Sequence, residues 1–413
     1  MVSKVRSLRT VMRFSWCVFA VVLVSFFPVN SYSQRVIADR PIMTKAPESI
    51  NMMLEPYCAK YGIPALGAAV VKGGRIIAIG AVGTRKAGEK IAVTPSDRFH
   101  IGSDSKAMTA LLVAMYVEQG KLRWDSRLEE IFPELAKTMG QGMGAITLEQ
   151  LLSHSSGMPA DSEPLSDKLI AESFTRSDDN LTDTRYWLVS RWITQPVAVP
   201  PKTRFLYSNM GYVMVGAVLD KVSGKSWEEL IVEKIFVPLK LRNAGFGPQS
   251  SIGRIDAPLP HKTMEGGKIK PMIAGPNADN PLFMGSAGTI HMSLQDFARW
   301  AAWSAGQGKR GPALVKPGTI SKLMTPVMDI TEDGKPGTPL TGRYALGWGM
   351  VKRPYADEYL VTHSGSNEMN LAHIVLDPAK DFGIVIMANI AGKETMKAFS
   401  IVGEELYKKY GNK

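Results

Sequence analysis

The sequence predicts an α+β fold, in which strands from both ends of the chain form one antiparallel sheet around a mostly helical insertion. Three observations support this: β-prone apolar runs in residues 60–102, helical patterns over about 120–280, and a return to strand patterns in 340–408. Apolar residues make up 45% of the chain and aromatic residues 8%, which is ordinary for a packed core and excludes a disordered chain. We therefore expect one domain over residues 45–408, with its sheet built from 60–102 and 340–408.

The N-terminal part of the sheet begins with a hairpin. Apolar runs at 65–71 and 75–82 flank a Lys-Gly-Gly turn, and residues 99–102 predict a further short strand. That strand leads directly into a helical pattern at 106–118 with apolar residues on nearly every face, as is typical of a buried helix. Further helices are expected at 148–152, 183–193, 211–222, 227–235, 293–300 and 393–407, and further strands at 344–351, 359–363, 371–376 and 382–388.

The first 33 residues predict a secretory signal peptide that is cleaved. Four basic residues among the first 13 precede an apolar run at 14–27, which is too short to span a bilayer comfortably. The small residues Ser31 and Ser33 suit a signal peptidase, and an uncleaved membrane anchor is the alternative. We expect an exported protein, periplasmic or extracellular, with no stable membrane span after cleavage.

Composition narrows the possible partners and cofactors. Removal of the signal's four basic residues lowers the formal net charge from +11 to +7, and the remaining Lys and Arg are scattered, which gives no case for nucleic acid. Only Cys58 of the two cysteines would remain, so the mature chain could form no intramolecular disulfide. The histidines lack metal-ligand spacing and no phosphate-cradling glycine loop occurs, so we expect neither a metal nor an organic cofactor.

The pair Ser103 and Lys106, in Ser-Asp-Ser-Lys, is the first candidate for catalysis. It is the single S-x-x-K of the chain and lies where a strand turns into a buried helix, so both side chains share one helix face. Burial of a lysine disfavours its charged form and makes it a possible proton acceptor for a serine nucleophile. The helix N-terminus also offers N–H groups to a developing oxyanion. From these residues alone, Ser103 as a helix cap beside a solvent-reaching Lys106 is equally open.

Two further stretches carry polar groups suited to acyl transfer. In Tyr207-x-Asn209, a tyrosine can relay a proton and an asparagine can hold a substrate amide. In the stretch that begins at His363, Gly365 lets a substrate backbone approach a strand closely, and the N–H of Ser366 can complete an oxyanion hole. Taken alone, His363 fits a half-buried strand histidine as well as a substrate-binding one.

These three stretches together resemble a known superfamily. No G-x-S-x-G and no H-E-x-x-H occurs, but S-x-x-K at 103–106, Y-x-N at 207–209 and H-x-G at 363–365 follow the order and approximate spacing of the serine β-lactamases and penicillin-binding proteins. With a tyrosine in its second motif, the chain resembles the class C branch of this superfamily, which has related esterases and D-amino-acid peptidases. The resemblance extends over about residues 50–405, including LLSHSSGMP at 151–159 and SAGTIHMSLQDFARW at 286–300.

The resemblance implies a β-lactamase/transpeptidase architecture with the site between the sheet and the helical subdomain. It also implies that the serine attacks an ester or amide carbonyl of a small-molecule or peptide-like substrate, and that water then hydrolyses the acyl-enzyme. The residues it assigns are Ser103, Lys106 and Tyr207 for catalysis, and Asn209, His363, Gly365 and Ser366 for oxyanion and substrate binding.

One departure from the class C β-lactamases bears on the substrate. Their usual third motif, K-T-G, is absent, and H-x-G resembles instead the peptidase and esterase members. A histidine is mostly neutral at pH 7, whereas a permanent cation suits the carboxylate of penicillins and D-Ala-D-Ala peptides. We therefore expect an exported serine hydrolase that cleaves an ester or a peptide-like amide. The alternatives are a class C-type β-lactamase or D-Ala-D-Ala carboxypeptidase, and a catalytically inactive envelope peptide-binding protein.

Overall fold

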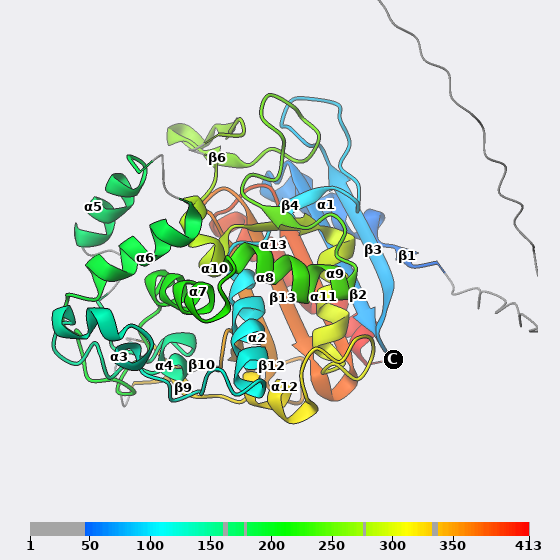
Figure 1. Ribbon diagram of the computed structural model, residues 1–413. Coiled ribbons are helices and arrows are strands. Elements are labelled where there is room, and N and C mark those ends of the chain that lie inside the picture. The colour runs from blue at the N-terminus through cyan, green and yellow to red at the C-terminus, as the bar shows by residue number, and fades with distance from the viewer. Residues whose placement is uncertain (1–45, 160–163, 177–179, 276–277, 333–337, 413) are drawn as a thin grey trace, which may run out of the picture. The chain divides into compact units, whose positions relative to one another are not determined.

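The computed structural model describes residues 46–159, 164–176, 180–275, 278–332 and 338–412 (Figure 1). The expected signal peptide lies outside these residues. Nine of the described strands form one sheet, in which every neighbouring pair is antiparallel except β1 with β3. Strands from both ends of the chain therefore meet in one sheet, and the predicted α+β class is confirmed. In sheet order the strands are β1 (Glu48–Ser49), β3 (Arg75–Gly83), β2 (Ala65–Lys72), β14 (Phe382–Ala388), β13 (Leu371–Asp377), β12 (Leu360–Ser366), β11 (Gly349–Val351), β10 (Leu340–Tyr344) and β9 (Met328–Thr331).

Helices cover both faces of this sheet. Alternate residues of β14 belong to two different cores: Ile384 and Ile386 pack with helices α1 and α13, whereas Val385 and Met387 pack on the side of α11. This follows from the strand pleat, which turns successive side chains to opposite faces. Because both faces are covered, the central strands are continuously apolar. The described helices are α1 (Asn51–Tyr61), α2 (Ser105–Glu118), α3 (Leu128–Ile131), α4 (Leu148–Leu152), α5 (Pro164–Ser173), α6 (Leu181–Trp192), α7 (Asn209–Ser223), α8 (Trp227–Ile231), α9 (Val237–Leu239), α10 (Gly285–Gly288), α11 (Leu294–Ala305), α12 (Pro317–Leu323) and α13 (Lys393–Leu406).

The helical part of the chain, with α3 to α7, lies on one side of α2 in Figure 1, and strands β13, β2 and β3 of the main sheet lie on the other. A buried ion network joins its helices: the Arg185 guanidinium of α6 contacts Asp220 of α7 at 2.7 Å and Glu228 of α8 at 2.9 Å. Arg185 is fully buried, so these two carboxylates stabilise a charge that would otherwise be costly. The network fixes α7, whose first residue, Asn209, belongs to the candidate site.

Helix α2 has the burial that its sequence predicts, since its first twelve residues are all buried. This follows from its apolar residues on every face and from its place between the sheet side and the helical part. Among the described residues, none of the helices combines the length and the apolar character needed to cross a bilayer.

Some local expectations differ from the structure. The strand expected at 344–351 is two strands, because a turn at Gly347, with φ 78°, brings the backbone against α2; a Cβ on Gly347 would lie 2.7 Å from the Lys106 carbonyl oxygen. Strand β4 (Arg98–His100) does not join the main sheet but pairs with β8 (Ile290–Ser293), which also pairs with β5 (Gly245–Phe246). Strand β6 (His261–Thr263) forms a separate two-stranded sheet with β7 (Ile269–Pro271).

Candidate active site

The candidate nucleophile lies in a single 3₁₀ turn between β4 and α2. Ser103 is the middle residue of this turn, Gly102–Asp104, and Gly102 has φ 49°, a left-handed conformation that favours glycine. The Ser105 hydroxyl donates to the Gly102 carbonyl at 2.7 Å and holds the turn. Ser103 lines a pocket of about 350 Å³ together with Asn209 and Ser366, so the first motif meets residues of the other two there.

Lys106 lies fully buried behind this serine. Its Nζ donates hydrogen bonds to three oxygens: the Ser103 Oγ at 3.0 Å, the Asn209 Oδ1 at 2.7 Å and the Ala287 carbonyl at 2.7 Å. The lysine therefore does not reach solvent, as it would beside a simple helix-capping serine. The Ala287 carbonyl could not be predicted from the sequence, because a backbone oxygen carries no residue-type signal.

Tyr207 lies at the edge of the same constellation. Its side chain is 38% exposed, and its ring centroid is 5.0 Å from the Lys106 Nζ. The buried His154 holds this segment in place, because its ring lies 4.2 Å from the Tyr207 ring and its Nδ1 accepts a hydrogen bond from the Ser208 N–H at 3.1 Å. His154 therefore acts on the second motif through packing and one hydrogen bond to the backbone.

Strand β12 reaches the nucleophile turn through a contact between two glycines. A Cβ on Gly365 would lie 1.8 Å from the Ile101 carbonyl oxygen and 2.8 Å from the Ser103 nitrogen, and a Cβ on Gly102 would lie 2.3 Å from the Ser366 nitrogen. No side chain fits between these two backbones. This direct contact between the two backbones brings the nitrogens of Ser103 and Ser366 to one wall of the pocket, which suits a two-donor oxyanion hole.

His363 lies in the interior, behind the pocket wall. Its Nδ1 donates to the Ser364 carbonyl at 3.0 Å, so its Nε2 accepts from the Tyr344 hydroxyl at 2.9 Å. Burial, with the nearby Lys106 charge as a second cause, lowers the pKa of His363 to about 3, and the imidazole is therefore neutral at pH 7. The Oδ1 of the buried Asp104 lies 3.5 Å from Nδ1, and burial raises the pKa of this carboxyl.

The remaining pocket walls consist of residues that belong to none of the three sequence motifs. The Asp279 Oδ1 lies 2.8 Å from the His100 Nε2 and accepts from the Asn367 amide at 3.1 Å, so the wall beside α10 contacts both β4 and the β12–β13 turn. Lys262 of β6 and Glu368 of that turn line the same pocket. Within the described part of the chain, no cluster of three or more His, Cys, Asp or Glu side chains could hold a metal ion.

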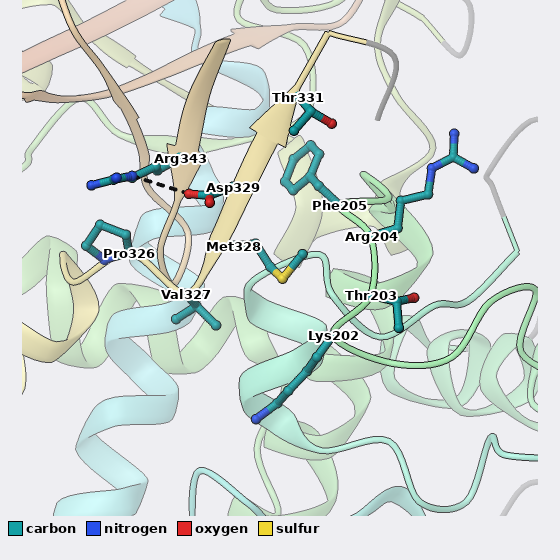
Figure 2. Close-up of a pocket in the computed structure, with 10 residues that line it drawn as sticks. All are labelled: Lys202, Thr203, Arg204, Phe205, Pro326, Val327, Met328, Asp329, Thr331 and Arg343. Atoms are coloured by element: carbon teal, nitrogen blue, oxygen red, sulfur yellow. Dashed lines mark ion pairs between the residues drawn. The ribbon is translucent and has the colours of Figure 1, made fainter. Parts of the chain in front are cut away.

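A larger hollow, of about 670 Å³, does not contain the nucleophile. It is lined by residues 202–205, 326–329, 331 and 343. Figure 2 shows that the side chains of Lys202, Arg204 and Arg343 point in different directions, and Arg343 pairs with Asp329 at 3.3 Å. These cations do not converge on one point, so the smaller pocket at Ser103 remains the candidate active site.

A serine whose hydroxyl contacts a buried lysine of S-x-x-K, beside a strand that offers a backbone N–H, is typical of serine hydrolases that form acyl-enzymes. The Beta-lactamase family model matches residues 50–401, and the chain belongs to this family. The predicted superfamily is thereby confirmed.

Individual relatives are distant. The chain is 24% identical to Protein flp of Staphylococcus aureus over 343 residues, which cover 83% of this chain but only 63% of that protein's length. A D-alanine carboxypeptidase AmpC from Burkholderia cenocepacia has a similar structure, with a TM-score of 0.64 at 20% identity over 85% of this chain and 97% of that one. A class C β-lactamase has a TM-score of 0.66 at 19% identity over 84% of this chain and 93% of that one. At such identities the two structures show a shared fold.

Proposed function

We propose that this chain hydrolyses an ester or a peptide-like amide through an acyl-enzyme on Ser103. The observation that carries the proposal is the 3.0 Å contact between the Lys106 Nζ and the Ser103 Oγ, made by a lysine with no exposed surface. A hydroxyl is a weak nucleophile unless a positioned base takes its proton, and this contact supplies the geometry for that transfer.

The reaction has two halves. In the first, Lys106 acts as a neutral amine: two N–H groups remain for Asn209 and Ala287, and its lone pair takes the Ser103 proton while the Ser103 oxygen bonds to the substrate carbonyl carbon. The N–H groups of Ser103 and Ser366 stabilise the negative oxygen. The bond to the leaving group then breaks, and that group takes the proton by way of Lys106 or Tyr207. In the second half, water gives a proton to the same base and adds to the acyl carbon. The bond between the acyl carbon and the Ser103 oxygen then breaks, the base returns the proton to that oxygen, and the acid leaves. Asn209 holds the lysine through its Oδ1 and lines the pocket where a substrate amide would lie.

For His363 we propose a positioning role in place of direct contact with the substrate. Its ring is buried between Tyr344 and Asp104 and does not line the pocket. A neutral imidazole there supplies no positive charge to a substrate carboxylate next to the reacting carbonyl. This supports an ester or amide without such a carboxylate over a penicillin. A fold neighbour described as a D-alanine carboxypeptidase keeps D-peptide amides among the substrates to test.

A pair of neighbouring serines provides the experiment. Ser103→Ala should lower kcat for a p-nitrophenyl ester by about three orders of magnitude or more, because the covalent step is lost. Ser105→Ala removes only the 2.7 Å hydrogen bond that holds the turn, so it should retain far more activity. Equal losses in the two variants, with intact folds by circular dichroism, would refute the assignment. No activity on any ester, D-amino-acid amide or nitrocefin would favour a catalytically inactive peptide-binding protein.

A further inference from the structure

We propose that Lys262 selects substrates that carry an anionic group at a distance from the scissile carbonyl, and that Glu368 is its counter-ion in the free protein. The inference rests on the proposed function and names a substrate class for the same site. Both residues line the pocket that contains Ser103. Lys262 comes from β6, in the two-stranded sheet, and Glu368 comes from the turn between β12 and β13 of the main sheet.

The side chain of Lys262 is 40% exposed, but hydrogen bonds of the preceding residue hold the backbone from which it projects. The preceding residue, His261, is fully buried: its N–H donates to the Asn389 carbonyl at 2.9 Å, and its Nε2 accepts from the Ala87 N–H at 3.1 Å. A parallel bridge to Ile390 adds a further link. The lysine therefore projects from a rigid support, which keeps its ammonium group at the pocket without the cost of ordering a loop.

The turn that carries Glu368 is held in an unfavourable conformation. Glu368 has φ 66°, a left-handed conformation in which glycine or asparagine would be less strained. Side chains of the turn enforce this geometry, since the Glu368 N–H donates to the Ser366 Oγ at 2.9 Å and the Asn370 N–H donates to the Asn367 Oδ1 at 3.0 Å. A costly residue at this position is consistent with a use for its carboxylate beside the pocket.

The pairing between the two residues is loose. The Lys262 Nζ and a Glu368 carboxylate oxygen are 3.9 Å apart, and the glutamate side chain is 88% exposed. An exposed pair at this distance contributes little to stability and is easily exchanged. A substrate carboxylate or phosphate could therefore replace Glu368 at Lys262 with little loss, and it would gain a charge-assisted hydrogen bond.

A second hollow extends the pocket beyond this pair. It has a volume of about 610 Å³ and shares Lys262 and Glu368 with the pocket at Ser103, so the two residues lie at the junction. Lys60 and Lys393 also line it. Its other carboxylate, Glu394, is bound at 2.6 Å by a lysine on the same helix. The groove past the junction is therefore net positive, which favours an anion on the distal part of the substrate.

Asp279, the remaining carboxylate of the inner pocket, does not reverse this preference. Its side chain is 3% exposed, and its Oδ1 accepts hydrogen bonds from the Asn280 N–H and the Asn367 amide and lies 2.8 Å from the His100 Nε2. Lys262 is also distinct from the third-motif position, which lies on β12 and holds the neutral His363. The distal anion that we infer is therefore different from the carboxylate next to the β-lactam ring.

The experiment compares matched esters that differ in the charge at the end of the acyl chain. The substrates are p-nitrophenyl butyrate, mono-p-nitrophenyl glutarate and p-nitrophenyl 4-aminobutyrate. Lys262→Met should lower the ratio of kcat/KM for the glutarate to that for the butyrate by about tenfold, as expected for one charge-assisted contact. Glu368→Gln should raise the same ratio. Lys270→Met is the matched control, because Lys270 faces Lys262 across the β6–β7 pair, is exposed and does not line the pocket.

Two results would overturn the inference. One is a glutarate-to-butyrate ratio that Lys262→Met leaves within twofold of the native value. The other is a preference for the aminobutyrate that Glu368→Gln abolishes, since the pocket would then recognise a cation. Binding of mono-p-nitrophenyl glutarate to Ser103→Ala, with and without Lys262→Met, gives a readout that needs no turnover. Failure of the native protein to hydrolyse any of the three esters would count against the proposed function, whereas loss of glutarate binding in the double variant would still support Lys262.

Discussion

Gly365→Ala tests whether the contact between β12 and the nucleophile turn builds the oxyanion hole. The φ of Gly365 lies outside the left-handed region, so alanine is compatible with the backbone itself. The whole effect must therefore come from the new methyl group. That group would lie 1.8 Å from the Ile101 carbonyl oxygen and 2.8 Å from the Ser103 nitrogen.

The size of the effect follows from these distances. Ordinary contact between such atoms needs about 3.5 Å, so β12 and the turn must separate by about 1.7 Å. A displacement of about 1 Å at a reacting group can cost about 100-fold in rate, and loss of one oxyanion donor costs about 100- to 1000-fold. We therefore expect Gly365→Ala to lower kcat for p-nitrophenyl butyrate by at least about 100-fold.

The matched control is Gly349→Ala on the neighbouring strand β11, where a Cβ would lie 3.3 Å from the Thr362 carbonyl oxygen and needs only a small adjustment. Steady-state kinetics and thermal melting would be measured for both variants. The control should keep kcat within a few-fold of native. A Gly365→Ala protein that melts near the native temperature and keeps kcat within about threefold would refute the two-donor oxyanion hole.

Three further predictions concern export, acid stability and substrate choice. Expressed with its own N-terminus in a Gram-negative host, the protein should be recovered outside the cytoplasm beginning near Gln34; intact mass of an unprocessed, membrane-held chain would favour an anchor. Burial lowers the pKa of His291, His363 and His373 to about 4, 3 and 4, so below pH 6.5 the unfolded chain binds protons that the folded chain does not. The free energy of unfolding should therefore fall as the pH drops from about 6.5 to 4, by up to about 1.4 kcal/mol per histidine per pH unit. The raised pKa of Asp104 opposes this fall, because the folded chain then binds a proton that the unfolded chain does not. A melting temperature that does not change over this range would contradict the burial of neutral histidines. Turnover of nitrocefin at pH 7 should be slow compared with turnover of p-nitrophenyl butyrate. Equal rates would contradict the preference for an ester or amide over a β-lactam.

The sequence predicted most elements of the fold because their signals are local. The Gly-Gly turn between two apolar, β-prone runs predicted β2 and β3, and apolar residues on every face predicted the burial of α2. The break between β10 and β11 could not be predicted in this way. It depends on the contact of Gly347 with the backbone of Lys106, 241 positions away in the chain.

The candidate site was predictable only as far as its motifs extend. Ser103, Lys106 and Asn209 carry side chains whose chemistry is visible in the sequence, and the structure brings them together. Lys262 could not be found in this way, because it lies in no motif and reaches the pocket through the pairing of a short strand. The orientation of His363 was also hidden, since the sequence does not show which strand face meets Tyr344.

The central claim is that Ser103 forms the covalent intermediate, and adduct mapping tests it most directly. The native protein, Ser103→Ala and Ser105→Ala would each be treated with a fluorophosphonate and analysed by intact mass and peptide mapping. We predict a single adduct on Ser103 in the native protein, the same adduct in Ser105→Ala, and none in Ser103→Ala. An adduct on another residue, or ester turnover by Ser103→Ala at the native rate, would contradict the account.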